Sequence, residues 1–282
     1  MSSIRQVRGR RVWDSRGRPT VEAELTLSDG SVGRAIAPAG ASTGTREALE
    51  LRDGGAAFGG LDVQRAVEHV NTSIARVLVG ADVRDQAALD QRLIDLDGTP
   101  DKSRLGANAT LAVSLAAAQA AAASAGVPLY RWLGGDAARL LPLPQIQIFG
   151  GGAHAGRRVD VQDFMVMCPA AGSFAQALEW TAEVYRSAGQ LMRERGHLHG
   201  VADEGGWWPD FDSNEQALQT LVAAIEHAGF VPGEQVAIAL DVAASEFGRN
   251  GRYTLGLEDR QLDADGLIEL LLRWIERYPI VS

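Results

Sequence analysis

The chain contains very little cysteine and almost no lysine. Cys168 is its single cysteine, which excludes an internal disulfide and a disulfide-stapled scaffold. Of the 27 basic residues only Lys102 is lysine. Arginine keeps its proton near neutral pH, whereas a buried lysine can release one. The chain therefore offers almost no candidate for a lysine general base.

Three kinds of segment are also missing. No apolar stretch of about 7–15 residues follows Met1, so we expect no secretory signal and a cytoplasmic location. Residues 105–127 carry little charge, but polar side chains interrupt them, and a membrane span needs roughly 20 strongly apolar residues. The net charge is −9 without a Lys/Arg cluster, so the chain lacks the basic face that binds nucleic acid. We expect neither a membrane span nor a nucleic-acid partner.

The first 40 residues have the pattern of strands. Residues 7–13 and 21–27 flank a turn cluster at 14–19, and the second run alternates apolar with polar side chains. Another tight turn at 28–30 precedes a third run at 32–37. This pattern predicts a three-stranded antiparallel meander.

From residue 62 the apolar period becomes helical. Helices are expected over 63–78, 87–95 and 107–125, the last closed by a glycine and a proline. Strands followed by helices predict an α+β domain, which we assign to residues 1–138. The proline-bearing segment Leu140–Pro144 is the expected boundary.

Short apolar runs alternate with long helical patterns in the second part. The expected strands are 146–149, 164–167 and 236–240, and the expected helices are 175–195, 215–228 and 264–278. Alternation of this kind predicts βα units around a parallel sheet or barrel. An eight-stranded barrel needs roughly 250 residues. Pro279–Ser282 has the pattern of a strand beginning. We therefore expect residues 139–282 to form an incomplete β/α barrel with at most four strands.

Two glycine-rich loops carry polar side chains. The first offers two hydroxyls and consists of Gly40, Ala41, Ser42, Thr43 and Gly44. Taken alone, it is best interpreted as a plain connector. The second follows a predicted strand and places His154 at the end of that strand, where glycine backbone can approach a ligand closely. A functional role is favoured for His154. The other histidines are interpreted as solvated (His197, His199) or as helix residues with a surface or partly buried role (His69, His227).

Acidic residues supply two further candidates and one ambiguous position. Asp203 and Glu204 precede two glycines and the pair Trp207-Trp208. Aromatic neighbours desolvate a carboxylate and raise its pKa, as a general acid requires. Asp241 ends an apolar run, where a carboxylate can present an oxygen ligand to Mg²⁺. Asp163 is ambiguous, because a strand-start role explains it equally well.

Together these segments closely resemble enolase, phosphopyruvate hydratase. The resemblance covers the whole chain in order, and it is carried by Asp14-Ser15-Arg16-Gly17, Gly40-Ala41-Ser42-Thr43-Gly44, Leu105-Gly106-Ala107-Asn108, His154-Ala155-Gly156, Asp203-Glu204-Gly205-Gly206 and Asp241-Val242-Ala243-Ala244-Ser245-Glu246-Phe247.

The resemblance implies an α+β domain that caps a modified β/α barrel. It implies reversible dehydration of 2-phospho-D-glycerate to phosphoenolpyruvate with two Mg²⁺ ions, and a homodimer if the barrel is completed. By similarity, Glu204 is the general acid, and His154 and Asp163 contact substrate. Asp241 and Ser42 are ligands of the two metals, Ser42 through a mobile loop.

The sequence departs from the enolase pattern near the expected mouth of the barrel. Where enolases have Asn, Ser and Glu, this chain has Gly150, Ala153 and Asp163, and where they have a Phe-Ala pair it has Trp207-Trp208. The family's later Glu and Asp metal ligands, lysine base and His-Arg-Ser segment have no counterpart in these 282 residues.

Three hypotheses follow. The first is an enolase or enolase paralogue whose sequence is truncated, or whose missing half is supplied by another polypeptide, and which is inactive as the isolated chain. The second is a non-catalytic remnant or interaction protein. The third is an enolase-like lyase or isomerase acting on another carboxylate.

Overall fold

The computed structural model describes residues 2–282, which divide into two compact units. The first unit holds the residues up to Gly40 together with Thr45–Leu140. The second holds Ala41–Gly44 together with Leu141–Ser282. Within residues 2–282, no helix is long and apolar enough to cross a membrane.

The first unit is built on a three-stranded antiparallel sheet, which confirms the predicted meander. Its strands are β1 (Ile4–Trp13), β2 (Pro19–Leu27) and β3 (Val32–Ala37), in the order β1-β2-β3. In the first turn, the carboxylate of Asp14 accepts hydrogen bonds from the backbone N–H groups of Arg16 (2.9 Å) and Arg18 (2.8 Å). This Asx-type turn explains why Asp14 stands where the chain reverses.

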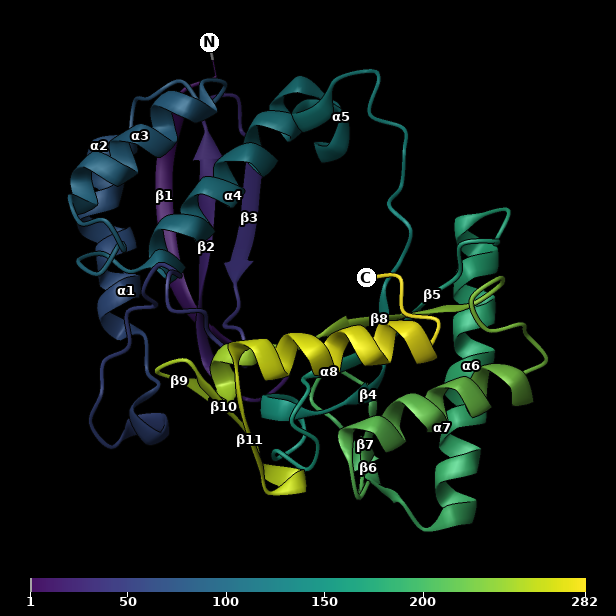
Figure 1. Ribbon diagram of the computed structural model, residues 1–282. Coiled ribbons are helices and arrows are strands. Elements are labelled where there is room, and N and C mark those ends of the chain that lie inside the picture. The colour runs from purple at the N-terminus through teal and green to yellow at the C-terminus, as the bar shows by residue number, and fades with distance from the viewer. Residues whose placement is uncertain (1) are drawn as a thin grey trace. The chain divides into compact units, whose positions relative to one another are not determined.

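Helices cover this sheet (Figure 1). A continuous helical segment is made of α1 (Gln64–His69), the π-helical turn η2 (Val70–Ile74) and α2 (Ala75–Leu78), and it is followed by α3 (Gln86–Asp97), α4 (Ala107–Ala125) and α5 (Leu129–Gly134). The predicted helices are confirmed, whereas α5 and the short turn η1 (Ala57–Gly60) were not predicted. The alanine-rich α4 packs on β2 and β3. It comes so close to β3 that a Cβ atom on Gly33 would lie 2.1 Å from the Ala116 carbonyl oxygen.

The second unit contains a five-stranded sheet. Its strands are β4 (Ile146–Gly150), β5 (Asp163–Met167), β6 (Leu198–Val201), β7 (Trp207–Pro209) and β8 (Ala237–Asp241), in the order β6-β7-β4-β5-β8. The prediction of a parallel sheet with at most four strands is wrong. Only β4 and β7 pair in parallel, and the other three pairs are antiparallel.

Two local connections explain this difference. Residues 151–162, between β4 and β5, hold only the helical turn η3 (Gly152–His154), so no helix carries the chain back across the sheet and β5 returns antiparallel. The segment 198–209 forms a hairpin, because Gly205 adopts a φ of +98° in the turn between β6 and β7. This hairpin adds the fifth strand.

The predicted strands and long helices of this unit are confirmed. The helices are α6 (Phe174–Arg195), α7 (Asn214–His227) and α8 (Ala264–Arg277), and side chains of Ser173, Ser213 and Asp263 cap their N-termini. A second small sheet was not predicted. It comprises β9 (Gly248–Arg249), β10 (Arg252–Leu255) and β11 (Arg260–Asp263), with the turns η4 (Ala244–Glu246) and η5 (Gly256–Glu258) beside its strands.

The main sheet of the second unit is open, not a closed barrel, in the part of the chain that the structure describes. Residues 279–282 extend along β8: Ile280 bridges Ile238 in parallel, and the Leu240 N–H donates to the Ser282 carbonyl (2.9 Å). The apolar C-terminal run thus has the backbone pairing of a strand beginning, as predicted. Cys168 is buried in this unit as a free thiol.

Candidate active site

Three strands of the second unit bring their polar ends to one edge of the sheet. Strands β4 and β8 both run antiparallel to β5, so the ends of β4 and β8 lie beside the start of β5. The register pairs Gly150 with Asp163, and Asp163 with Asp241. These three residues therefore form one row across the sheet.

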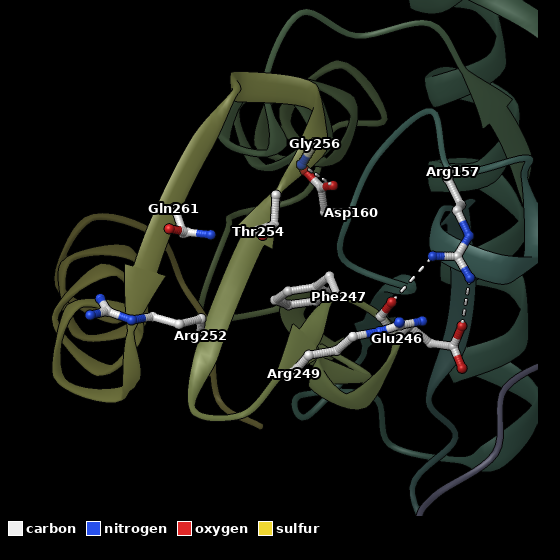
Figure 2. A pocket seen from close by; sticks show the side chains of 9 residues that line it. All are labelled: Arg157, Asp160, Glu246, Phe247, Arg249, Arg252, Thr254, Gly256 and Gln261. Carbon is white, nitrogen blue, oxygen red and sulfur yellow. Dashed lines mark hydrogen bonds and ion pairs between the residues drawn. The ribbon is translucent and has the colours of Figure 1, made fainter.

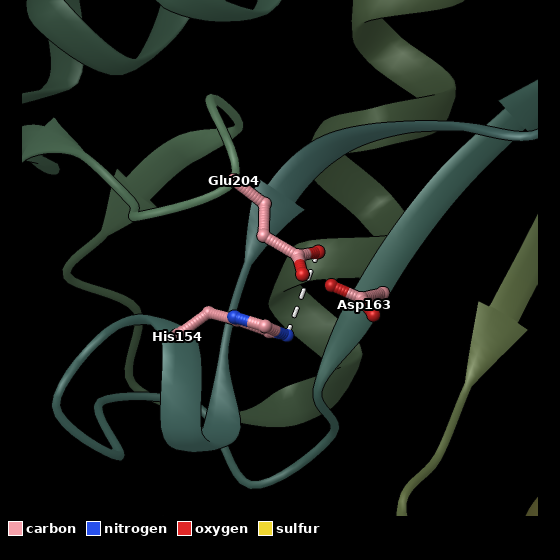
Figure 3. Close-up of side chains that lie close together, drawn as sticks. All are labelled: His154, Asp163 and Glu204. Atoms are coloured by element: carbon pink, nitrogen blue, oxygen red, sulfur yellow. Dashed lines mark ion pairs between the residues drawn. The ribbon is translucent and has the colours of Figure 1, made fainter. Parts of the chain in front are cut away.

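His154, Asp163 and Glu204 converge at this edge (Figure 3). One ligand atom of each residue lies within 4.8 Å of those of the other two. His154 comes from η3 after β4, Asp163 begins β5, and Glu204 lies in the β6–β7 turn. The structure thus assembles one acidic, imidazole-containing site from segments that are far apart in the sequence.

Glycine places His154 in this site. A Cβ atom on Gly151 would lie 2.2 Å from the Val161 carbonyl oxygen, and Gly152 has a φ of +47°. These two glycines let the η3 turn lie directly on residues 159–162. The imidazole of His154 is therefore almost fully buried, with 2% of its side chain exposed.

His154 lies between two adjacent carboxylates. Its Nδ1 atom is 2.6 Å from the Asp203 carboxylate, and its Nε2 atom is 3.5 Å from Glu204. A carboxylate accepts only, so Nδ1 carries a hydrogen and donates it to Asp203. In the neutral imidazole, Nε2 is then an acceptor aimed at Glu204. The arrangement allows His154 and Glu204 to share a proton.

Two glutamines hold the neighbouring acids. Gln147 donates from Nε2 to Asp163 and accepts at Oε1 from the Gly206 N–H (2.9 Å). The Nε2 atom of Gln162 lies 3.3 Å from Asp163 and 3.4 Å from Asp241. Gln162 is 5% exposed, and its Oε1 atom is buried without a hydrogen-bond partner among residues 2–282. Gln162 thus donates toward both carboxylates, and its own acceptor oxygen is left without a donor among the described residues.

The turn that carries Glu204 is anchored from three sides. The Ala202 N–H donates to the Gly206 carbonyl (2.7 Å), and Gln147 holds the Gly206 N–H. The Tyr185 hydroxyl donates to the Gly205 carbonyl (2.8 Å), and burial raises the pKa of this phenol, which keeps it a donor. The backbone on both sides of Glu204 is thereby fixed.

The tryptophans do not desolvate Glu204, so that prediction is wrong. The Glu204 side chain is 53% exposed. Trp207 instead stacks on Tyr185, with ring centroids 4.5 Å apart, and its Nε1 donates to the Tyr185 carbonyl (2.8 Å). Trp208 lies beside Gly156. Sequence adjacency to Glu204 misleads here because the strand β7 directs Trp207 against α6.

The remaining histidines lie outside this cluster. His197 is half-buried, with Nδ1 2.6 Å from the Asp210 carbonyl and its ring 5.9 Å from Phe211, so the solvated interpretation is wrong for it. The backbone carbonyl and Phe211 hold this ring in place. His199 is exposed on β6, and its Nε2 is 3.5 Å from Asp210. His227 contacts the Ser187 hydroxyl (2.9 Å), and His69 is half-buried on α1.

Ser42 and Asp241 have less defined surroundings. Asp241 is exposed at the end of β8, and its second oxygen accepts from the Ala243 N–H (3.0 Å). Ser42 is half-buried in the irregular segment Ala41–Gly44, which belongs to the second unit, whereas Gly40 belongs to the first. Their roles as metal ligands stay predictions, as do the catalytic and substrate roles of the cluster.

Sequence reasoning missed three residues of the site. Asp203 was noted only as a neighbour of Glu204, and Gln147 and Gln162 were not singled out. A polar residue inside or directly before a short buried strand is the signal that could have found the glutamines.

Comparison with known proteins gives the family. Residues 4–133 match the sequence family model of the enolase N-terminal domain. Residues 138–282 match the family model of the enolase C-terminal TIM barrel domain. "Enolase 1" of Desulfitobacterium hafniense (strain Y51) is 50% identical over 99% of this chain. The chain spans 64% of the length of that relative. It belongs to the enolase family, with an enolase N-terminal domain followed by part of the TIM barrel domain.

Proposed function

We propose that this chain is the larger part of an enolase-type lyase that interconverts 2-phospho-D-glycerate and phosphoenolpyruvate. In this proposal residues 1–138 and 139–282 are its two domains. The observation that carries the proposal is the placement of His154 between Asp203 and Glu204, with Asp163 in the same cluster. His154 and Glu204 can both carry a proton, and they lie beside the carboxylate of Asp163. Such a pair is suited to deliver one proton to a leaving hydroxyl.

The reaction removes a proton next to the substrate carboxylate and releases the β-hydroxyl as water. Glu204 donates the proton that the hydroxyl needs in order to leave. His154, held by Asp203, presents Nε2 to Glu204. After each turnover Nε2 can take a proton from water, and the imidazolium so formed can pass it to the Glu204 carboxylate. Asp163 contacts the substrate, and the hydrogen bonds from Gln147 and Gln162 fix its carboxylate.

The donor set near Asp241 fits Mg²⁺. This ion prefers oxygen ligands, and the edge offers the carboxylates of Asp241 and Asp163 and the unpartnered Oε1 of Gln162. We assign Asp241 to the first metal and Ser42 to the second. Bound Mg²⁺ supplies positive charge that stabilises the negative charge developing on the substrate carboxylate.

The α-proton needs a base that these residues do not supply. The resemblance to enolases implies that this base is a lysine. Lys102 is the single lysine of the chain, and its ammonium lies 3.3 Å from the Thr99 carbonyl in the turn after α3. A positioned base typically contributes about 10²–10⁴-fold. We therefore expect the 282-residue chain to be inactive by itself.

The experiment measures phosphoenolpyruvate formation by the purified chain with excess Mg²⁺, alone and with a polypeptide equivalent to the last third of the D. hafniense relative. We expect activity only in the mixture, and its loss in the Glu204→Gln variant. Activity of the chain alone that Glu204→Gln abolishes would show that the base is misassigned. A mixture that binds substrate without turnover would contradict the proposed lyase.

A second candidate is an enolase-like lyase for another carboxylate. The observation in its favour is the shorter Asp163, whose two oxygens are already engaged by Gln147 and Gln162. The same assay with a panel of 2- and 3-hydroxycarboxylates distinguishes the candidates, because the second predicts turnover without a substrate phosphate.

A further inference from the structure

A cavity of about 420 Å³ lies outside the His154 cluster. It is bounded by the loop after η3 and by the small sheet β9–β11 (Figure 2). Its volume is in the range of small-molecule sites, which is roughly 300–1,000 Å³. Arginines, two carboxylates and two uncharged polar side chains account for most of its lining.

The carboxylates of this cavity are already engaged. Asp160 accepts from the Gly256 N–H (2.8 Å) and from the side-chain amide of Asn214 (2.8 Å). Glu246 accepts from Arg157 (3.1 Å), and Figure 2 shows this pair on one side of the cavity. Arg157 balances the charge of Glu246, whereas the donors on Asp160 are neutral and leave its charge in place. The lining therefore carries three arginines against two carboxylates.

The donors, by contrast, are free. Arg249 and Arg252 lie directly opposite each other in the β9–β10 register. Neither guanidinium has an ion-pair or hydrogen-bond partner among residues 2–282, and the two extend in opposite directions in Figure 2. Like charges directly opposite each other destabilise a sheet. The side chains of Thr254 and Gln261 are also without partners in the described part of the chain.

We propose that this cavity binds a small multivalent anion of the phosphate class, held by Arg249 and Arg252. Guanidinium groups bind phosphate oxygens through paired, charge-assisted hydrogen bonds. Both side chains are exposed, so they can turn from their opposed directions (Figure 2) toward one anion, which would offset their repulsion and accept hydrogen bonds from both guanidiniums. The site uses none of His154, Asp163 and Glu204, so it is independent of the proposed lyase activity.

The test is a calorimetric titration of the full chain with pyrophosphate, without divalent cations. We expect saturable binding of one pyrophosphate per chain. Arg249→Gln and Arg252→Gln should each weaken it about tenfold or more, because each removes charge-assisted hydrogen bonds to the anion. The side-chain Nε–H NMR signals of both arginines should shift on addition of pyrophosphate.

Matched variants make the result specific. Arg260→Gln removes an exposed arginine that does not line the cavity, and it should leave binding unchanged. Glu204→Gln should also leave it unchanged, so failure of the lyase proposal and failure of this site are seen separately. Absence of saturable binding up to about 10 mM pyrophosphate, or an equal loss in Arg260→Gln, would overturn the proposal.

Discussion

Asp163 and Asp241 are directly paired across the antiparallel strands β5 and β8, and the amide of Gln162 reaches both carboxylates. Two acids in this relationship repel each other. A divalent cation at this edge would replace the repulsion by attraction. The pairing is therefore the structural basis of the proposed cation site.

Asp241→Asn is expected to weaken Mn²⁺ binding by roughly 10–100-fold, since the loss of a ligand should cost at least as much as the loss of an outer-shell partner. Electron paramagnetic resonance of free Mn²⁺ measures the affinity of the full chain. Asp265→Asn, at an exposed position of α8, is the control. Equal affinities for all three proteins would remove Asp241 from the metal site.

Asp203→Asn is expected to change the tautomer of His154. In the parent chain the proton of the neutral imidazole is on Nδ1, held by the carboxylate 2.6 Å away. Without that carboxylate, Nε2 becomes protonated and donates to Glu204. Two-bond ¹H–¹⁵N NMR correlation distinguishes the two forms. Asp212→Asn, which removes an exposed carboxylate from the same unit, should leave the tautomer unchanged. An Nε2–H tautomer in the parent chain would disprove the assignment.

Asp97→Ala is expected to destabilise the first unit by about 1–3 kcal/mol at neutral pH. Burial acts to raise the pKa of Asp97, but hydrogen bonds from Thr99 and Leu105 outweigh it and the pKa is lowered. Because the pKa of Asp97 is lower in the native state than in the unfolded chain, its carboxylate stabilises the fold fully at pH values above the ordinary aspartate pKa. This stabilisation is lost as the pH falls through the native pKa of Asp97.

Urea unfolding at neutral and acidic pH tests this prediction. The stability difference between the parent and Asp97→Ala should shrink in acid. The exposed Asp95 on the same helix provides the control Asp95→Asn, which should behave like the parent. A difference that grows as pH falls would reverse the sign of the argument.

Gly33→Ala is expected to cost about 3 kcal/mol or more, because the new methyl group would meet backbone atoms of α4 that cannot move singly. A Cβ at Gly33 lies 2.1 Å from the Ala116 carbonyl oxygen and 2.2 Å from the Ala120 nitrogen. Chemical denaturation measures the loss. Gly200 has no atom within 4 Å of such a Cβ, so Gly200→Ala should be nearly neutral. Similar stabilities of both variants would contradict the close approach.

Most elements were predictable because their apolar periods are long and clear. The meander of the first unit and the helices α4, α6, α7 and α8 were predicted within a few residues. The direction of the strands was not predictable, because the alternation of strands and helices in the sequence does not show whether β5 runs parallel or antiparallel to β4. That direction depends on the absence of a crossover helix between Gly150 and Asp163.

Four residues at this edge of the sheet were predicted from the sequence. His154 and Glu204 were singled out because their chemistry is conspicuous beside glycines, Asp241 because it ends an apolar run, and Asp163 through the resemblance to enolases. Gln147 and Gln162 act through register and hydrogen bonding, which no local pattern encodes. Trp207 was assigned to the wrong neighbour for the same reason, because its contact with Tyr185 joins two elements of the fold.

The packing of Trp207 on α6 also constrains how this sequence can evolve. A Cβ atom on Gly189, in the middle of that helix, would lie 2.4 Å from the Cζ2 atom of Trp207. Glycine inside a helix costs about 0.5–1 kcal/mol relative to alanine, so its presence is explained by the ring that covers it. A smaller residue at 207 would leave a void that a larger residue at 189 could fill. Positions 189 and 207 are therefore expected to covary, and neither substitution should be tolerated well without the other.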